Sequence, residues 1–173
     1  MTDFLVDVQT DDEQWSEVAK DTILWVQQAK DALYATLCGR EELPLMQEDK
    51  PLALCVCLSY DAKVRELNRD FRGLDKPTNV LSFANIDFAD FATENQMFAE
   101  IDLGNVIIAL ETLQREAAEQ GITFKAHFMH LLVHGMLHIL GYDHIEQQDA
   151  EQMENLEVEI LANLGIDNPY EKD

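Results

Sequence analysis

Three histidines within residues 134–144 constrain this chain more than any other feature: His134-Gly-Met-Leu-His138-Ile-Leu-Gly141-Tyr-Asp-His144. His134 and His138 are four residues apart, so a helix places their imidazoles one above the other on the same face. Gly141 follows three residues later, and glycine enters the left-handed conformation at little cost, so it can end the helix and turn the chain back. We expect this reversal to bring His144 to the open side of the first two imidazoles.

Three imidazoles that converge from a helix and the following turn suit a divalent transition metal, zinc first. Three protein ligands leave the fourth position of a tetrahedral site to water, and an open position is typical of catalytic zinc rather than structural zinc. The alternative is three unrelated histidines in an apolar helix, but the whole chain has five histidines and three of them lie here. We therefore predict a metal site on His134, His138 and His144.

The spacing of the first two histidines is shared with zinc proteases, but the comparison fails at the next residue. The protease motif requires a glutamate directly after the first histidine, where it acts as the general base. Here that position is Gly135. Peptide hydrolysis by that mechanism is therefore not expected, and the site needs a different substrate or a base from elsewhere in the fold.

The bulk composition indicates a single globular domain over residues 1–173. The length and the 47% of hydrophobic residues suit one core, and no apolar run approaches the ~20 residues that span a bilayer. The first residues lack the basic start and apolar stretch of a signal peptide, so we expect a cytoplasmic protein. Cys38, Cys55 and Cys57 are odd in number and are expected to be buried, reduced thiols. A metal-ligand role is the less favoured alternative for them, because no fourth ligand accompanies them.

The formal net charge of −22, from 34 acidic and 12 basic residues, argues against a nucleic-acid partner when taken alone. The distribution changes this argument, because five of the basic residues fall close together: Lys63, Arg65, Arg69, Arg72 and Lys76. Arg65, Arg69 and Arg72 are spaced i, i+4 and i+7 and form one stripe if the segment is helical. The ordinary interpretation is a solvated helix face, but in so acidic a chain this stripe is the place where an anion is attracted.

Hydrophobic periodicity predicts strands and helices that interleave along the chain. Strands are expected at 3–9, 51–60, 79–86 and 103–110, and helices at 13–38 (one or two), 61–69, 111–120, 124–140 and 146–164. Asp61 and Thr123 are the predicted N-caps of two helices. Residues 87–100 are expected to form a mobile insertion. This order predicts an α/β (α+β) fold, in which a mixed sheet of about four strands packs with about five helices and the metal site lies on a helix–turn.

Two further histidines lie on the helix that carries the motif. His127, His130, His134 and His138 fall within about 80° of arc at ~100° per residue, so this face points at the site. His130 and His127 are therefore candidates for proton transfer or substrate contact. For His130 a structural role is equally consistent, and for His127 packing or capping is favoured.

Asp143 has two interpretations. Its carboxylate could orient a ligand imidazole from behind. The slightly favoured alternative is that Asp143 is the N-cap of the last helix, with Glu146 three residues later completing a capping box.

The motif residues resemble those of a known family. The segment 134–144 is similar to the signature of the YbeY family of bacterial metal-dependent endoribonucleases, and Leu67-Asn-Arg-Asp-Phe-Arg72-Gly-Leu-Asp-Lys-Pro-Thr-Asn-Val-Leu-Ser-Phe83 resembles the central motif of that family. Leu103-Gly104-Asn105-Val-Ile-Ile108 is similar to its third block, and the match covers about residues 50–166. Asn105 replaces the usual aspartate and Ala84 a frequent proline, and residues 87–100 look like an altered loop. These departures leave the three histidines and Arg72 intact.

The resemblance implies a single-strand-specific endoribonuclease that acts in 3′-end maturation of small-subunit (16S) ribosomal RNA and in ribosome quality control. It implies one zinc per chain on His134, His138 and His144, and a catalytic set formed by these histidines and Arg72. The implied partners are single-stranded rRNA, the small ribosomal subunit and an Era-type GTPase, with no membrane and no DNA partner. The basic stripe and the histidine face add Arg65, Arg69 and His130 as candidate substrate-binding residues.

The chemistry of these residues fits such a role, because a bound metal polarises a phosphoryl oxygen and lowers the pKa of its water from about 15.7 towards 7. A guanidinium presents a fork of donors suited to phosphate. Two rival functions stay open. One is a non-catalytic ribosome-assembly factor with a structural metal, whose removal would unfold the domain. The other is a metal-dependent hydrolase of a small ester or amide, which needs a compact apolar pocket rather than an open groove beside Arg65, Arg69 and Arg72.

Overall fold

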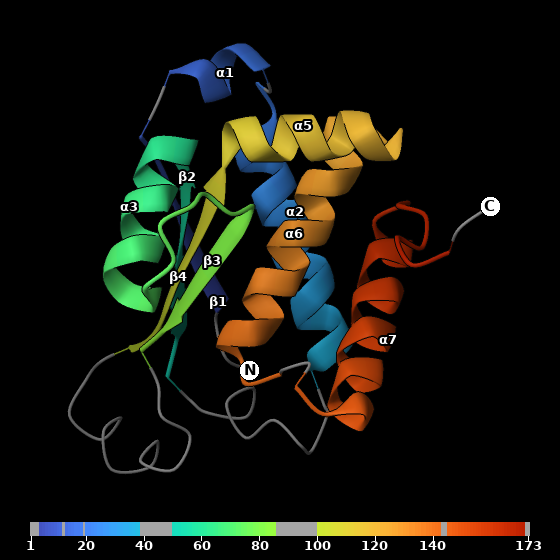
Figure 1. Cartoon of the computed structure of the whole chain (residues 1–173). Helices are drawn as coiled ribbons and strands as arrows, with labels where there is room; N and C mark the ends of the chain where they lie inside the picture. The colour runs from blue at the N-terminus through green and yellow to red at the C-terminus, as the bar shows by residue number, and fades with distance from the viewer. Residues whose placement is uncertain are drawn as a thin grey trace.

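A computed structural model describes residues 4–11, 13–18, 20–38, 50–85, 100–142 and 145–171 (Figure 1). These residues form a mixed four-strand sheet and six helices, which confirms the predicted fold class. The elements are β1 Phe4–Thr10, α1 Gln14–Val18, α2 Thr22–Leu37, β2 Leu52–Ser59, α3 Asp61–Arg72, β3 Val80–Ala84, β4 Ile101–Ala109, α5 Leu110–Gln120, α6 Phe124–Ile139 and α7 Gln147–Asn163. The helix count exceeds the expected five because the stretch 13–38 forms both α1 and α2. None of the described helices combines the length and the apolar character that crossing a membrane requires.

The strand order in the sheet is β1-β2-β4-β3, which puts β3 at one edge. β1 pairs with β2 and β2 with β4 in parallel, whereas β3 pairs with β4 in the antiparallel direction, with Val80 opposite Ile108. The connection from β1 to β2 contains α1 and α2, and that from β2 to β4 contains α3 and β3, as parallel pairing requires a crossover. The short antiparallel strand β3 therefore ends one side of the sheet, and no other described strand pairs with its outer edge.

The two faces of the sheet are covered unequally (Figure 1). On β2, Leu52, Leu54, Val56 and Leu58 are buried and belong to the main core, which also takes in the apolar sides of α2, α6 and α7. On the opposite face, α3 packs through a much smaller cluster centred on Val64. Because burial of apolar area dominates folding stability, α6 in the main core is held far more firmly than α3.

Two of the predicted helix caps are wrong and one is confirmed. The Thr123 side chain accepts a hydrogen bond from the Ala126 backbone N–H at 3.0 Å, as expected of an N-cap. Tyr60 is the N-cap of α3, and Asp61 lies inside the first turn, where its carboxylate accepts from the backbone N–H and the hydroxyl of Thr112 on α5. The N-cap of α7 is Glu146, because the helix begins at Gln147, so the cap predicted at Asp143 is also wrong.

The three cysteines are free thiols, but the prediction that all are buried is wrong. Cys38 is exposed, and Cys55 and Cys57 are half-buried, because they lie on the face of β2 that α3 covers only in part. Their sulfur atoms are 3.7 Å apart. Burial raises the pKa of the Cys57 thiol to about 12, and the neighbouring Cys55 adds to this effect. The Cys57 thiol is therefore protonated at neutral pH.

Candidate metal-binding and catalytic site

Helix α6 brings the first two histidines of the motif together. The Nε2 atoms of His134 and His138 face each other at 3.0 Å. The helix ends at Ile139, and Gly141 has a φ of 104°, so the chain leaves the helix through the glycine turn that the sequence predicts. His144 and Asp143 lie outside the described residues, and the convergence of His144 on the other two imidazoles stays a prediction.

The two imidazoles fit a shared transition-metal ion. Nitrogen atoms that bind one tetrahedral zinc at about 2.0–2.1 Å are roughly 3.3 Å apart, close to the observed separation of the two Nε2 atoms. The Nδ1–H of His134 donates to the Oε1 atom of Glu157, which leaves the Nε2 lone pair of His134 for a metal. A carboxylate behind a metal-binding imidazole fixes its ring and its tautomer. Among the described residues no third ligand joins this pair.

Glu157 and Tyr170 belong to the site, although the sequence analysis did not identify them. Glu157 is on α7 and is 0% exposed, and its Oε2 atom accepts a hydrogen bond from the Tyr170 hydroxyl. Nε2 of His130 lies 3.2 Å from that hydroxyl oxygen and therefore donates to it. Burial alone would raise the pKa of Glu157, but His130, whose Nε2 atom is 3.8 Å from Oε2, and the hydrogen bonds from His134 and Tyr170 outweigh burial and lower the pKa to about 2. Glu157 is therefore a buried, ionised carboxylate, and each of its two oxygen atoms accepts a hydrogen bond.

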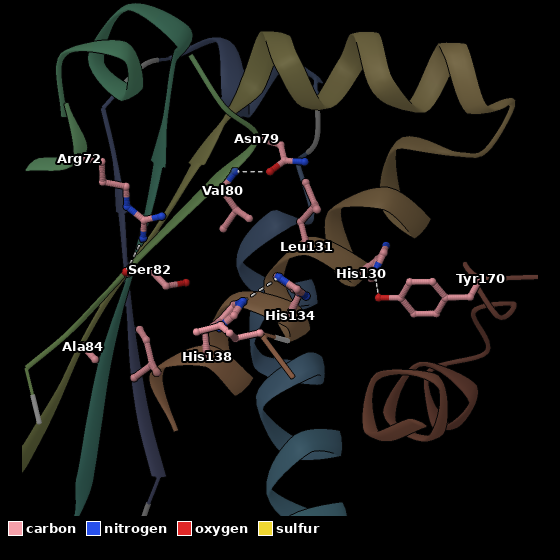
Figure 2. A pocket seen from close by; sticks show the side chains of 12 residues that line it. Arg72, Asn79, Val80, Ser82, Ala84, His130, Leu131, His134, His138 and Tyr170 are labelled. Carbon is pink, nitrogen blue, oxygen red and sulfur yellow. Dashed lines mark hydrogen bonds between the residues drawn. The ribbon is translucent and has the colours of Figure 1, made fainter. Parts of the chain in front are cut away.

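The imidazoles and Tyr170 border a groove of about 630 Å³ between α6 and the edge strand β3 (Figure 2). His130, His134 and His138 line one side from α6, and Tyr170 closes that side. Val80 and Ser82 of β3 line the other side, together with Arg72 from the end of α3. The groove therefore lies at the edge of the sheet, where β3 separates the end of α3 from α6.

Gly135 explains why the motif departs from that of the zinc proteases. A Cβ atom at this position would lie 2.8 Å from Cγ1 of Val106, 3.2 Å from Oγ of Ser82 and 3.3 Å from Cγ2 of Val80. The Ser82 hydroxyl donates to the Gly135 carbonyl at 3.1 Å. Residue 135 thus faces β3 and β4 at close range, and a glutamate side chain would not fit there.

Arg72 reaches the groove from the opposite side of β3. Its Nη2 atom donates to the backbone carbonyl of Ser82 at 3.4 Å, and its guanidinium carbon lies 6.0 Å from the centroid of the Phe83 ring. Figure 2 shows the guanidinium at the rim, with the histidines across the edge of the strand. Arg72 is exposed and forms no ion pair within the described part of the chain.

The other two arginines of the stripe are placed differently. Arg65 forms a two-point ion pair with Asp75, with distances of 2.8 and 3.2 Å, and Arg69 pairs with Asp70 at 3.1 Å. Neither of them lines the groove. Their predicted contact with substrate therefore concerns the surface around the groove and stays a prediction.

His127 and Asn105 lie away from the groove. His127 is 3% exposed, its Nε2 atom is 3.4 Å from Glu116, and burial lowers its pKa, all of which fits the packing role that the sequence favoured. Asn105 lies opposite Phe83 and Cys55 in the strand register, on the side of β4 away from Val106 and α6. A carboxylate at position 105 would therefore not enter this groove.

Fold and groove together define a class: a small α+β protein whose histidine-bearing helix borders the edge strand of a mixed sheet. The family model described as "Endoribonuclease YbeY" matches residues 9–165. This match spans most of the chain, and the chain belongs to the YbeY endoribonuclease family.

Individual relatives agree with this assignment. "Endoribonuclease YbeY" of Paramagnetospirillum magneticum is 49% identical over 138 residues, which cover 80% of this chain and 80% of the relative. The protein of the same name from Rhodospirillum rubrum is 42% identical over 171 residues, covering 98% of this chain and 84% of the relative. The solution structure of TM1509 from Thermotoga maritima is similar with a TM-score of 0.53 and 18% identity, covering 96% of this chain and 99% of that one, which supports the fold.

Proposed function

We propose that this protein is a zinc-dependent, single-strand-specific endoribonuclease of the bacterial cytoplasm that acts in 3′-end maturation of small-subunit rRNA and in ribosome quality control. The observation that carries this proposal is the groove in which two metal-competent imidazoles lie across the edge of β3 from Arg72. The relatives are named endoribonucleases, which supports RNA cleavage as the reaction class.

Each side of the groove has its own task. His134 and His138, together with His144, would hold the metal, which when bound supplies a Lewis acid and an activated water. Glu157 keeps the His134 ring in the orientation that leaves Nε2 for the metal. His130 borders the groove and is a candidate for substrate contact or proton transfer.

Arg72 would hold the scissile phosphate. Phosphodiester cleavage develops negative charge on the phosphoryl oxygens, and a guanidinium placed at that point stabilises it through paired N–H donors. Arg72 suits this task because no described carboxylate neutralises it and because its contacts with the Ser82 carbonyl and the Phe83 ring place the guanidinium at the rim of the groove.

The remaining charges determine how RNA reaches the groove. Arg65 and Arg69 would add a weak attraction, since each already has an acidic partner. The overall charge of −22 opposes non-specific binding of RNA. We therefore propose that docking on the small ribosomal subunit, with an Era-type GTPase as a further partner, delivers the substrate.

Substitution of the arginines tests this assignment. Arg72→Ala is expected to lower kcat/KM for a single-stranded RNA about 100-fold, as loss of one oriented donor to developing charge does elsewhere, with zinc content and melting temperature unchanged. Arg72→Lys should recover only part of the loss, because an ammonium lacks the planar fork. Arg65→Ala serves as the matched control on the same helix. We expect it to lower kcat/KM less than about threefold, mainly through a higher KM, and we expect added salt to make this difference smaller. Cleavage at the wild-type rate by metal-loaded Arg72→Ala would remove the proposed role.

A further inference from the structure

Phe71 is an aromatic side chain that the fold leaves in solvent. It precedes Arg72 on α3 and is 70% exposed, the largest exposed fraction of any aromatic residue in the described part of the chain. Its ring lies against that of Phe83, with the centroids 5.5 Å apart and the planes at 62°. A single exposed hydrophobic side chain is ordinary on a protein surface, so the argument for a ligand depends on where Phe71 lies, beside Phe83 and Arg72.

The ring is held in place beside the groove. Phe83 is half-buried, packs against the cluster around Val64, and lies under the guanidinium of Arg72 at 6.0 Å. Arg72 in turn lines the groove. A continuous surface therefore runs from the histidines over Arg72 and Phe83 to Phe71, and a chain molecule whose phosphate is at Arg72 would extend over Phe71.

We propose that Phe71 is the stacking platform for a nucleobase next to the phosphate held by Arg72, with Phe83 supporting the ring from beneath. This inference rests on the proposed ribonuclease function and adds a base-binding subsite to it. Aromatic side chains stack on any of the four bases, because every base has a π face, so the subsite would be tolerant of sequence. Only an unpaired base can leave its own stack to reach the ring, so the subsite would also favour single strands over duplexes.

Local charge favours a nucleobase over an apolar protein partner. Three basic residues, Arg69, Arg72 and Lys76, and three acidic residues, Glu66, Asp70 and Asp75, lie within five positions of Phe71, so this surface is about neutral in a chain whose formal net charge is −22. Within the described part of the chain, Arg72 has no acidic partner. The loop after α3 is fixed as well, because the Asn68 side chain donates to the Lys76 carbonyl at 2.9 Å. An exposed ring next to a guanidinium that has no described acidic partner combines the stacking surface and the positive charge found in single-strand binding sites.

An RNA substrate with missing bases tests the proposal directly. Zinc-loaded full-length protein is given a single-stranded RNA with one cleavage site, and a series of the same RNA in which one nucleotide at a time, on either side of that site, is replaced by an abasic residue. For the wild type, we expect one position at which loss of the base raises KM about tenfold with little change in kcat. For Phe71→Ala, the KM for the intact RNA should be raised by the same factor, and removal of that base should have no further effect.

Matched variants separate stacking from other roles of this surface. Phe71→Trp should retain the base effect, whereas Phe71→Leu, which keeps an apolar side chain without a π face, should lose it. Leu74→Ala removes a neighbouring aliphatic side chain that is 48% exposed and should behave as the wild type. Melting temperatures of all variants, measured beside the kinetics, identify any change caused by unfolding.

Three outcomes would overturn the base subsite: wild-type KM in Phe71→Ala, a Phe71→Ala protein that still distinguishes the abasic RNA, or no position at which the wild type responds to loss of a base. If Phe71→Ala instead cleaves normally but binds isolated small subunits less tightly, the surface is a protein-docking site and the subsite is rejected. If the wild type cleaves no RNA, the proposed function fails. The subsite is then judged separately, from the binding of intact and abasic RNA by fluorescence anisotropy.

Discussion

The two sides of the groove are built in opposite ways. On the α6 side, His134 is held by Glu157, which is 0% exposed and accepts hydrogen bonds through both carboxylate oxygens. On the α3 side, Arg72 is exposed and has one long hydrogen bond to a backbone carbonyl. The difference indicates that the side proposed to bind the metal is organised before substrate arrives, whereas the side proposed to bind phosphate can adjust to an RNA strand.

Packing explains this contrast. Helix α6 lies between the sheet and α7 in the main core, and its register is fixed where Gly135 meets Val106 and Ser82. Helix α3 buries only Val64 and Asn68 and turns its charged side chains outward. The imidazoles therefore have little freedom to move, while the Arg72 side chain has more.

Glu157→Gln gives the largest expected effect on the ordered side of the groove. The amide keeps the shape but removes the negative charge behind His134, so we expect zinc affinity to fall 10- to 100-fold. Zinc titration with a competing chelator measures this effect, and Glu154→Gln, an exposed change on the same helix, is the matched control. Wild-type affinity in Glu157→Gln would mean that the two sides do not differ in preorganisation.

Gly135→Ala tests how tightly α6 is seated against β3. The added Cβ would meet Cγ1 of Val106 at 2.8 Å, and overpacking of this kind costs about 1–3 kcal/mol of unfolding free energy. Urea unfolding of the protein is the measurement. On the opposite side, Phe71→Ala should change stability by less than about 0.5 kcal/mol, as exposed substitutions do. Equal losses of unfolding free energy in Gly135→Ala and Phe71→Ala would contradict the proposed difference in packing between the α6 and α3 sides.

The sequence predicts the α6 side of the groove better than the α3 side, because helical periodicity and capping depend on residues close together in the chain. The helix that carries His134 and His138, its Thr123 cap and its glycine turn follow from neighbouring residues. The edge position of β3, which lets Arg72 reach the groove, depends on the strand order. The partners of Arg65 and Arg69 depend on side-chain contacts that no periodicity reveals.

Glu157 shows that one missed residue did leave a signal. The last helix carries many acidic residues, which suggests a solvated outer face. Glu157, however, falls within the helical stripe formed by Met153, Leu156 and Ile160, all of which are buried. A charged residue in an apolar stripe indicates a buried partner, here His134. Asp61 was assigned wrongly for a related reason, because its partner Thr112 lies 51 residues away in the chain.

The most direct test of the central claim is metal content measured together with RNA cleavage, on the wild type and on His134→Ala, with the folded state of both checked by circular dichroism. The account predicts about one zinc per wild-type chain, cleavage of single-stranded ribosomal RNA, and a folded variant that has lost both. A variant that loses metal and fold together would contradict it and favour a structural metal. So would a metal-loaded wild type that never cuts ribosomal RNA.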